Sequence, residues 1–429
     1  MTPAPARAPG ADTVWAATVI PAPQAAALRG DRRADVAVIG GGYAGLSAAL
    51  HLAESGVDVA LLESGEIGEG ASGRNNGQVI PGFKYDPDEL AAKLGETGER
   101  MAAWGGKLGD LVFSLIEKHR IDCAPRRAGW LQLAHSSGMA RTVERRAAQW
   151  RNRGVDADFL DWPATAKILG TERYHGAWID RRAGSVQPLS YARGLAFAAM
   201  RAGAHIFVQS PAQELERASR GWRVTTDRGG VTADTVLIAT NAYTGDLWPG
   251  LRRSFIPAHS IQSATAPLDA SLRASILPRG EVASDTQRII FYYRLDPEGR
   301  FIIGGRGSFG ETNPPLLFQY IERAASRFFP FLKKPRWEYR WGGKIAMTMD
   351  FLPRLHVLGP GVFAALGCNG RGVALATGMG RVLADLARGA MAADVPLPIT
   401  PMRQIPFFEF RRPALTAITH YYRLRDMIG

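Results

Sequence analysis

Three glycines and one glutamate are spaced as in a nucleotide-binding turn. Gly40, Gly42 and Gly45 form the pattern G-x-G-x-x-G, and Glu63 follows 18 residues after the last glycine. Gly40 allows a tight turn, and Gly42 has no Cβ, so the backbone can approach a pyrophosphate. The carboxylate of Glu63 can accept hydrogen bonds from both hydroxyl groups of an adenosine ribose. These residue types and spacings predict dinucleotide binding.

A predicted strand, helix and second strand would hold these residues in place. Residues 36–39 are apolar and largely β-branched, which indicates a short buried strand. Apolar residues at helical spacing over 46–53 predict a helix that begins at the glycines and ends at Gly56. Residues 57–62 form the second predicted strand, which ends at Glu63. The helix N-terminus would present N–H groups and partial positive charge to a phosphate. A βαβ turn that binds no ligand is the alternative.

A second glycine-rich turn lies near the end of the sequence. Residues 362–366 read as a strand that runs into glycines, with a helix starting near Gly372. Two helix N-termini suit one long ligand with negative charge in two places. Residues 236–242 read as a further buried strand that ends on small residues, where backbone can approach a cofactor. An ordinary strand-to-helix turn is the alternative for residues 367–372.

The composition predicts a soluble protein of two domains. The 429 residues exceed what a single core usually holds, and 46% hydrophobic with 21% charged residues is ordinary for a globular chain. No apolar run reaches the length of a membrane span. The formal net charge is +12, but the basic residues are dispersed and do not form the block that nucleic-acid binding needs. A flavoprotein that binds RNA or a protein partner remains an alternative that rests on this charge alone.

The cysteines and histidines exclude several kinds of site. Cys123 and Cys368 are too few for a disulfide framework and do not form C-x-x-C, so a reducing cytoplasm is expected. The eight histidines are dispersed without metal-ligand spacing, and no phosphate-binding glycine–lysine loop of the Walker A kind occurs. We therefore expect no metal and no phosphoryl transfer.

The rest of the chain alternates between helical and extended patterns. Residues 1–30 are rich in Ala and Pro and predict an extended arm with Trp15 as its anchor. Apolar spacing predicts one long helix over 88–118 and another over 314–331. Residues 254–310 are rich in strand patterns that suit a sheet with one covered face.

Four strings in order resemble the glycine-oxidase and D-amino-acid-oxidase family of FAD-dependent oxidoreductases. They are GASGRN at 70–75, GSVQPLSYARGLA at 184–196, ATNAYTG at 239–245 and GCNGRGVALATGMGRVLADL at 367–386. The likeness covers nearly the whole chain. Within the family, the γ-glutamylputrescine oxidases are the most similar subgroup, and its members imply a role in polyamine catabolism.

The resemblance implies an α/β fold with two interleaved domains. One is a Rossmann-like FAD-binding domain with a central parallel sheet, and the other is a mainly antiparallel α+β substrate domain. The implied boundaries are an N-terminal arm (1–33), the FAD-binding domain (34–84, 185–250 and 341–395), the substrate domain (85–184 and 251–340) and a C-terminal tail (396–429).

The resemblance also implies which residues bind FAD. The ADP half would contact Gly40, Gly42, Tyr43, Ala44, Gly45, Glu63 and Ser64. The ribityl chain and flavin would pass near Ser72, Arg74, Asn75 and Gln78. Ala212 would meet the adenine and Thr240 would follow the strand beneath it. The pyrimidine edge would lie at Gly370, Arg371, Gly372 and Val373, where a helix N-terminus can stabilise the negative charge of a reduced flavin.

Two departures from related sarcosine oxidases concern the flavin. Ile345 stands where those relatives have a cysteine that tethers FAD, so a non-covalent cofactor is expected. Ile302 stands where they have a lysine that promotes reaction with oxygen, which puts rapid oxidase behaviour in doubt. Lys344 is expected to face away from a flavin that Ile345 faces, because successive strand residues point to opposite sides. Arg74 or Arg371 could supply the cation instead.

The expected reaction is oxidation of the C–N bond of a small amine or amino acid to an imine, with hydride transfer to flavin. The first candidate substrate is γ-glutamylputrescine or a similar compound, with O₂ as acceptor and H₂O₂ as product. A D- or N-methyl amino-acid dehydrogenase that passes electrons to a quinone or carrier is the alternative. Arg306 is the candidate for binding a substrate carboxylate, and Tyr292 for lining the same pocket. A structural role for both is the competing interpretation.

Overall fold

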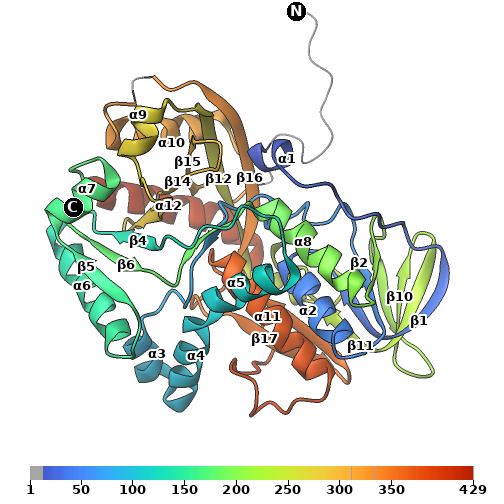
Figure 1. The fold of residues 1–429 in the computed structure, drawn as a ribbon. Coiled ribbons are helices and arrows are strands. Elements are labelled where there is room, and N and C mark those ends of the chain that lie inside the picture. The colour runs from blue at the N-terminus through green and yellow to red at the C-terminus, as the bar shows by residue number, and fades with distance from the viewer. Residues whose placement is uncertain (1–12, 311, 333, 429) are drawn as a thin grey trace, which may run out of the picture.

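The chain folds around two large sheets (Figure 1). The computed structural model describes residues 13–310, 312–332 and 334–428. The first sheet is mostly parallel and the second mainly antiparallel. The predicted mixed α/β fold is therefore confirmed.

The first sheet has the strand order β17-β18-β11-β1-β2-β8, and β10 and β9 extend it from β11. Its strands are β1 (Gly30–Ile39), β2 (Val59–Leu62), β8 (His205–Phe207), β9 (Glu214–Arg217), β10 (Trp222–Thr226), β11 (Gly229–Ile238), β17 (Arg354–Gly359) and β18 (Val362–Leu366). All four residues of β2 are apolar and buried, as expected for a parallel strand covered on both faces. Because β1, β2, β8, β11 and β18 run parallel, their carboxyl ends share one edge of the sheet.

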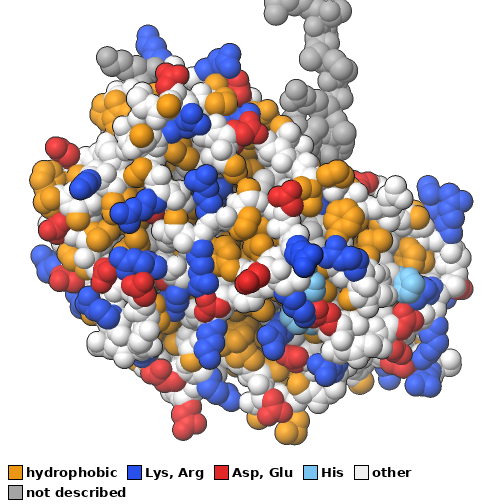
Figure 2. Space-filling view, viewed as in Figure 1, with side chains coloured by type: hydrophobic (Ala, Val, Ile, Leu, Met, Phe, Trp, Pro, Cys, Tyr) orange, Lys and Arg blue, Asp and Glu red, His pale blue; other side chains and the backbone are white. Residues whose placement is uncertain are grey.

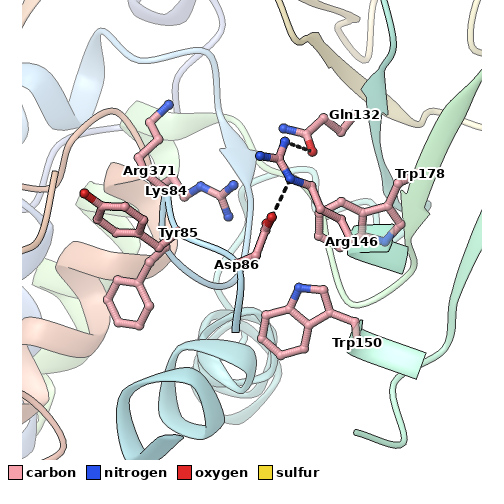
Figure 3. A pocket seen from close by; sticks show the side chains of 9 residues that line it. Lys84, Tyr85, Asp86, Gln132, Arg146, Trp150, Trp178 and Arg371 are labelled. Atoms are coloured by element: carbon pink, nitrogen blue, oxygen red, sulfur yellow. Dashed lines mark hydrogen bonds and ion pairs between the residues drawn. The ribbon is translucent and has the colours of Figure 1, made fainter. Parts of the chain in front are cut away.

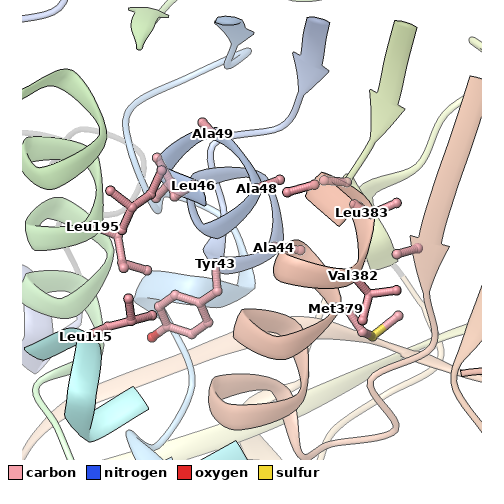
Figure 4. Close-up of a cluster of buried hydrophobic side chains, with 14 of the residues drawn as sticks. Tyr43, Ala44, Leu46, Ala48, Ala49, Leu115, Leu195, Met379, Val382 and Leu383 are labelled. Atoms are coloured by element: carbon pink, nitrogen blue, oxygen red, sulfur yellow. The ribbon is translucent and has the colours of Figure 1, made fainter. Parts of the chain in front are cut away.

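Three helices pack together on this sheet (Figure 4). They are α2 (Tyr43–Ala53), α8 (Pro188–Arg201) and α11 (Gly372–Ala387). Leu46 of α2 faces Leu195 of α8, and Val382 of α11 lies on the other side of α2. A Cβ on Gly380 would lie 2.3 Å from the carbonyl oxygen of Ala44, so only a glycine lets α11 approach α2 this closely. The two helices are thereby fixed against each other.

The second sheet has the strand order β16-β12-β15-β14-β13-β4-β6-β5. Its strands are β4 (Trp130–Leu133), β5 (Ala157–Leu160), β6 (Ala177–Asp180), β12 (Ile256–Pro267), β13 (Val282–Asp285), β14 (Tyr292–Leu295), β15 (Arg300–Arg306) and β16 (Trp337–Met347). Helix α10 (Pro315–Phe328) covers one face of it, as predicted over 314–331. Phe329, just after α10, makes edge-to-face contacts with Tyr293 and Phe301 at ring-centre distances of 5.2 and 5.3 Å. These aromatic rings form a core separate from that of the first sheet.

The single long helix predicted over 88–118 is wrong, because three helices occupy this stretch. They are α3 (Pro87–Leu94), α4 (Glu96–Gly106) and α5 (Leu108–His119). Gly95 separates the first two with φ +57°, and Lys107 separates the last two. A Cβ on Gly98 would lie 2.0 Å from the carbonyl oxygen of Leu90, so the break folds α4 back against α3.

The arm is anchored through Trp15, as predicted. Trp15 lies in α1 (Val14–Ala17), is fully buried, and donates its Nε1 hydrogen to the carbonyl oxygen of Asn75 at 2.8 Å. Its ring also packs edge-on against Trp341. The part of the predicted arm over 1–12 lies outside the described residues.

Short elements and four further helices complete the described chain. They are β3 (Gln78–Val79), β7 (Gly184–Ser185), α6 (Ser137–Arg151), α7 (Trp162–Leu169), α9 (Ala270–Ser275) and α12 (Arg411–Ile428). The domain division given above remains a proposal. Its boundary at residue 341 falls inside β16, which pairs with β12 along its length, so we place this boundary after Met347.

Charge is dispersed on the molecular face shown in Figure 2, where lysine and arginine side chains alternate with acidic ones. This face therefore lacks the basic stripe expected of a nucleic-acid-binding surface. Among the described helices, none combines the length and apolarity needed to cross a membrane.

Candidate functional site

The first glycine turn has the geometry of a phosphate cradle. Gly40 has φ +109°, a conformation that favours glycine. A Cβ on Gly45 would lie only 1.9 Å from the carbonyl oxygen of Gly40, so α2 can begin directly against the turn. Gly42 is the N-cap of α2 and makes no side-chain capping bond. The first turn of α2, with Tyr43, Ala44 and Gly45, thus brings backbone N–H groups to the carboxyl edge of the sheet.

Glu63 lies beside this turn at the end of β2. Its Oε2 accepts from the backbone N–H of Gly41 at 2.5 Å, and its Oε1 accepts from the N–H of Gly65 and the hydroxyl of Ser64 at 2.9 and 3.0 Å. A carboxylate has about four acceptor positions, so these three bonds fix Glu63 and leave capacity for a ligand hydroxyl. The backbone carbonyl of Glu63 accepts from Ser210 at 2.8 Å, which holds the loop that carries Ala212 next to Glu63.

The segment 70–78 is tied to the start of α2. The Ser72 hydroxyl accepts from the Tyr43 N–H at 3.0 Å, and the Tyr43 hydroxyl donates to the Ser72 carbonyl at 2.7 Å. Asn75 donates its amide N–H to the carbonyls of Ala71 and Ser72. These bonds bring Ser72 and Asn75 to the glycine turn.

Arg74 and Gln78 are directed to other parts of the protein. Arg74 donates to the Glu69 carbonyl at 2.8 Å and lies against Gly343 of β16. Gln78 is buried and donates to the carbonyl of Ala283 in the second sheet at 3.2 Å. The segment therefore links the first glycine turn to the second sheet.

The second glycine turn is held next to the end of β11 by Asn241, which sequence reasoning missed. Asn241 Oδ1 accepts from the Gly367 N–H at 3.0 Å, and its Nδ2 donates to Cys368 Sγ at 3.3 Å. Thr240, one residue earlier, lies against Gly40. The two glycine turns are thereby placed at the same edge of the first sheet. An asparagine at a strand end was the only sequence signal for this link, because Asn tolerates the positive φ found here.

The second turn starts α11 without a side-chain cap. Gly370 has φ +86°, Arg371 is the N-cap, and Gly372 and the buried Val373 are the first helical residues. The Arg371 side chain turns away from the helix axis and donates to the Pro81 carbonyl at 2.6 Å.

These features together fit an FAD molecule. The N-cap residues of α2 and α11 make no side-chain bond, so both first turns can provide N–H donors for the pyrophosphate and for the flavin edge, although the Tyr43 N–H is donated to Ser72. Glycines leave space where a Cβ would block backbone approach, and Glu63 provides the acceptor for a ribose. In the part of the chain that the structure describes, no cluster of three or more possible metal ligands occurs.

Arg306 and Tyr292 meet on the second sheet. The Tyr292 ring lies over Gly304, where a Cβ would clash with it at 2.1 Å, and its hydroxyl bonds that of Ser260. Burial raises the pKa of Tyr292 to about 12. Arg306 donates to Met347 Sδ at 3.0 Å, and burial lowers the pKa of its guanidinium. Within the described residues Arg306 has no ion-pair partner, so it is a half-buried cation that lacks a counter-ion.

Lys84 joins this group and was not predicted. Its side chain is exposed, although many protein atoms surround its amino group. Burial, followed by the charges of Arg371, Arg306 and Arg146, lowers the pKa of Lys84 to about 7. No acidic partner of Lys84 occurs among the described residues. Three unpaired cations, Lys84, Arg306 and Arg371, therefore surround one region between the second glycine turn and the second sheet.

The residues that were compared with the sarcosine oxidases lie in different surroundings. Ile302 is fully buried in an apolar cluster with Trp15 and Trp341. Lys344 lies over the Tyr243 ring with its Nζ 5.9 Å from the ring centre. Both Ile302 and Ile345 are apolar side chains that cannot form a covalent bond to a flavin.

Comparison with known proteins places the chain among flavoproteins. The family model for DAO, the FAD dependent oxidoreductases, matches residues 35–386. The probable oxidoreductase OrdL of Rhizobium meliloti is 33% identical over 96% of each chain. The γ-glutamylputrescine oxidoreductase of Escherichia coli is 32% identical over 92% of this chain and 93% of its own. The structure of glycine oxidase from Bacillus cereus superposes with a TM-score of 0.68 at 26% identity, covering 83% of this chain and 95% of that one.

Proposed function

Because the chain belongs to the DAO family of FAD-dependent oxidoreductases, which act on amines and amino acids, we propose that it oxidises a small amino compound. The first candidate substrate is γ-glutamylputrescine or a similar compound, with non-covalent FAD and O₂ as acceptor. The name of the Escherichia coli relative supports the substrate class. The observation that carries the proposal is the group of three cations without acidic partners among the described residues, Lys84, Arg306 and Arg371, beside the second glycine turn.

The chain's own residues would hold the cofactor at two ends. The N-terminus of α2 would bind the pyrophosphate, and Glu63 the ribose. The N-terminus of α11 would bind the pyrimidine edge through the backbone of residues 370–373. FAD, when bound, supplies the acceptor for the hydride that leaves the substrate carbon.

Arg306, Lys84 and Tyr292 would position the substrate. A guanidinium can fork onto a carboxylate, and a protonated lysine next to it adds a second charge-assisted bond. The same positive charges lower the pKa of a nearby substrate ammonium, because like charges disfavour the protonated form. A neutral amine, which oxidation requires, would therefore be more abundant in the site than in water.

A D- or N-methyl amino-acid dehydrogenase that uses a quinone or carrier is the second candidate. The apolar surroundings of Ile302 favour it, because no lysine is present there to attract oxygen. Measurement of H₂O₂ formed under air distinguishes O₂ from a quinone or carrier as the electron acceptor. An equimolar yield of H₂O₂ and imine-derived carbonyl supports the oxidase, and turnover only with an added quinone supports the dehydrogenase.

Reduction of the flavin by substrate under anaerobic conditions tests the function independently of the electron acceptor. The purified protein is expected to be yellow, to release its FAD on denaturation, and to lose its flavin absorbance when mixed with its substrate. A panel of γ-glutamyl amines, polyamines and D-, L- and N-methyl amino acids covers the proposed classes. A colourless protein that does not regain a flavin spectrum with added FAD would overturn the proposal.

The pKa of Lys84 predicts how carboxylate binding depends on pH. A bound carboxylate favours the protonated lysine, so the pKa rises above about 7 in the complex. Affinity for acetate is therefore expected to be highest below about pH 7 and to fall up to about tenfold per unit as the pH rises. Titrations followed by the flavin spectrum between about pH 6 and about pH 9 measure this, since acetate keeps its charge there.

Lys84→Met provides the comparison for this pH profile. The variant should bind acetate more weakly below about pH 7 and with a flat profile, since methionine does not titrate. The titratable groups around Lys84 are Arg371 and Cys368 in the second glycine turn, Arg306 on β15 and Arg146 on α6. If the slope persists in the variant, one of the other groups causes it and the assignment to Lys84 is wrong.

A further inference from the structure

Four buried side chains donate hydrogen bonds to the backbone of the segment 74–76. Its three successive carbonyl oxygens all accept at least one of these bonds. The donors, at 2.7–3.1 Å, are Gln262 and Trp341 for the carbonyl of Arg74, Trp15 for that of Asn75, and Arg294 for that of Asn76. Gln262, Arg294 and Trp341 belong to the second sheet, whereas Trp15 belongs to the arm. The peptide groups of the segment are therefore oriented by residues outside the first sheet.

The segment lies between the two helix N-termini proposed to bind FAD. At one end the Asn75 side chain donates to the Tyr43 hydroxyl at 3.1 Å, next to the first glycine turn. Shortly after the segment, the Pro81 carbonyl accepts from Arg371, the N-cap of α11, which lines a small cavity together with Lys84 (Figure 3). A ligand that reaches from the first glycine turn to the second therefore passes along this segment.

The peptide group between Asn75 and Asn76 has a partner on one side only. The peptide is trans, so its C=O and N–H bonds point in opposite directions. The carbonyl accepts from Trp15, and the N–H therefore points away from the arm. In the chain that the structure describes, the Asn76 N–H has no hydrogen-bond partner, although Asn76 is only 7% exposed. Buried N–H groups without a partner are rare, so an acceptor is expected on that side.

The neighbouring N–H groups already have partners. Asn75 donates its backbone N–H to the Ala71 carbonyl at 3.1 Å, and Gly77 donates its own to Asn75 Oδ1 at 2.8 Å. The Asn76 side chain is directed to the second sheet, where it donates to Gln262 Oε1 at 2.9 Å. The backbone N–H of Asn76 is thus the donor of this segment that a ligand can use.

A carbonyl oxygen of the flavin is the acceptor that suits this position. The flavin ring presents two carbonyl oxygens at its pyrimidine edge, which is the edge proposed to lie at residues 370–373. The segment leads to these residues through the bond between Pro81 and Arg371. Reduction of the flavin adds negative charge to its carbonyl oxygens, so a fixed N–H donor stabilises the reduced form more than the oxidised form.

We propose that Trp15 is a positioning residue of the flavin site. Its indole N–H holds the Asn75 carbonyl so that the Asn76 N–H donates to a carbonyl oxygen of the flavin. The arm thereby raises the reduction potential of bound FAD, and with it the driving force for hydride transfer from the substrate. The inference rests on the proposed FAD site and adds to it a residue from outside the FAD-binding segments.

The reduction potential of the bound FAD tests this inference without any substrate. Trp15→Phe removes the indole N–H and keeps an aromatic ring against Trp341. Once the peptide is released, the affinity for reduced FAD relative to oxidised FAD should fall about tenfold. This change lowers the two-electron potential by about 30 mV. Equilibration of the holoprotein with a reference dye, at saturating FAD, measures the potential.

Trp341→Phe is the matched control, because it removes an indole N–H from the same segment and a ring from the same aromatic contact. The Arg74 carbonyl keeps its bond from Gln262, so the potential should stay unchanged. Both variants lose one buried hydrogen bond and are expected to unfold at a lower temperature than the parent protein. Trp162→Phe, at an exposed tryptophan on α7, should change neither potential nor stability.

The outcomes separate this inference from the proposed function. An unchanged potential in Trp15→Phe, or an equal fall in Trp341→Phe, means that the arm only stabilises the fold, and overturns the inference. Failure of Trp15→Phe to bind FAD at all overturns it too, because the indole would then be needed to form the site. If the potential falls as expected but no amine reduces the flavin, the proposed function fails while the positioning role of Trp15 stands.

Discussion

Gly45→Val is expected to yield a protein that binds no FAD and unfolds at a much lower temperature. A Cβ at this position would lie 1.9 Å from the Gly40 carbonyl oxygen, 3.1 Å from its carbon and 3.3 Å from Val38 Cγ1. Two of these atoms are backbone, so relief requires α2 to move away from β1. Overpacking of this kind costs about 3 kcal/mol when the backbone must shift. The loss of cofactor removes a further stabilisation, about 2.7 kcal/mol at a hundredfold excess of FAD over its Kd.

The measurements are the flavin-to-protein absorbance ratio after purification and the thermal midpoint with and without added FAD. Gly138→Ala is the control, because its Cβ would meet nothing closer than 4.0 Å on helix α6 and alanine favours a helix. This variant should keep its FAD and match or exceed the stability of the parent protein. If Gly45→Val retained stoichiometric FAD, the assignment of the α2 N-terminus to the pyrophosphate would be wrong.

The nucleotide-binding half of the site could be predicted because its residues lie close together in the sequence. The glycines, the following helix and Glu63 all lie within about 30 residues, and each has a separate conformational or chemical reason to be there. The βαβ geometry then follows from strand and helix periods. The second glycine turn was predictable for the same reason, since strand, turn and helix are contiguous in 362–387.

The cation group could not be predicted because its members are far apart in sequence. Lys84, Arg146, Arg306 and Arg371 come from a loop, a helix, a strand and a helix cap, and only the fold brings them together. A lysine after a Pro-Gly turn has no local feature that separates it from a surface lysine. Arg306 was identified by its position after a predicted strand. Its partial burial and its lack of a counter-ion appear only when β15, β12 and β16 pair.

The wrong prediction of one long helix over 88–118 has a different cause. The apolar stripe continues in phase through three helices, so periodicity alone does not reveal the breaks. The glycines at 95, 105 and 106 were visible, and glycine inside a helical pattern is a warning of a break. Gly105 is needed within α4, because a Cβ on it would lie 2.6 Å from the Phe83 ring. This close approach packs α4 against the segment that carries Lys84.

Arg306→Met is expected to reduce kcat/KM for carboxylate-bearing substrates by about a hundredfold, since a charge-assisted bidentate pair contributes about 2 to 3 kcal/mol. Most of the change should appear in KM, because the carboxylate is bound equally before and during the reaction. Oxidation of neutral amines of similar size should be unaffected. The thermal midpoint should stay the same or rise, because methionine of similar length replaces a half-buried cation without a counter-ion.

Two further variants distinguish binding of the substrate carboxylate by Arg306 from a structural role of this residue. Arg306→Lys keeps the charge but not the planar fork, and should recover only part of the lost affinity. Arg323→Met removes an exposed arginine on α10, which covers the same sheet, and should leave both kinetics and stability unchanged. Equal losses for neutral and carboxylate-bearing amines in Arg306→Met would mean that the arginine maintains the shape of the pocket through Met347 rather than binding the substrate. A fall in stability together with loss of flavin would lead to the same conclusion, because an arginine whose role is to bind an anion is not needed for folding.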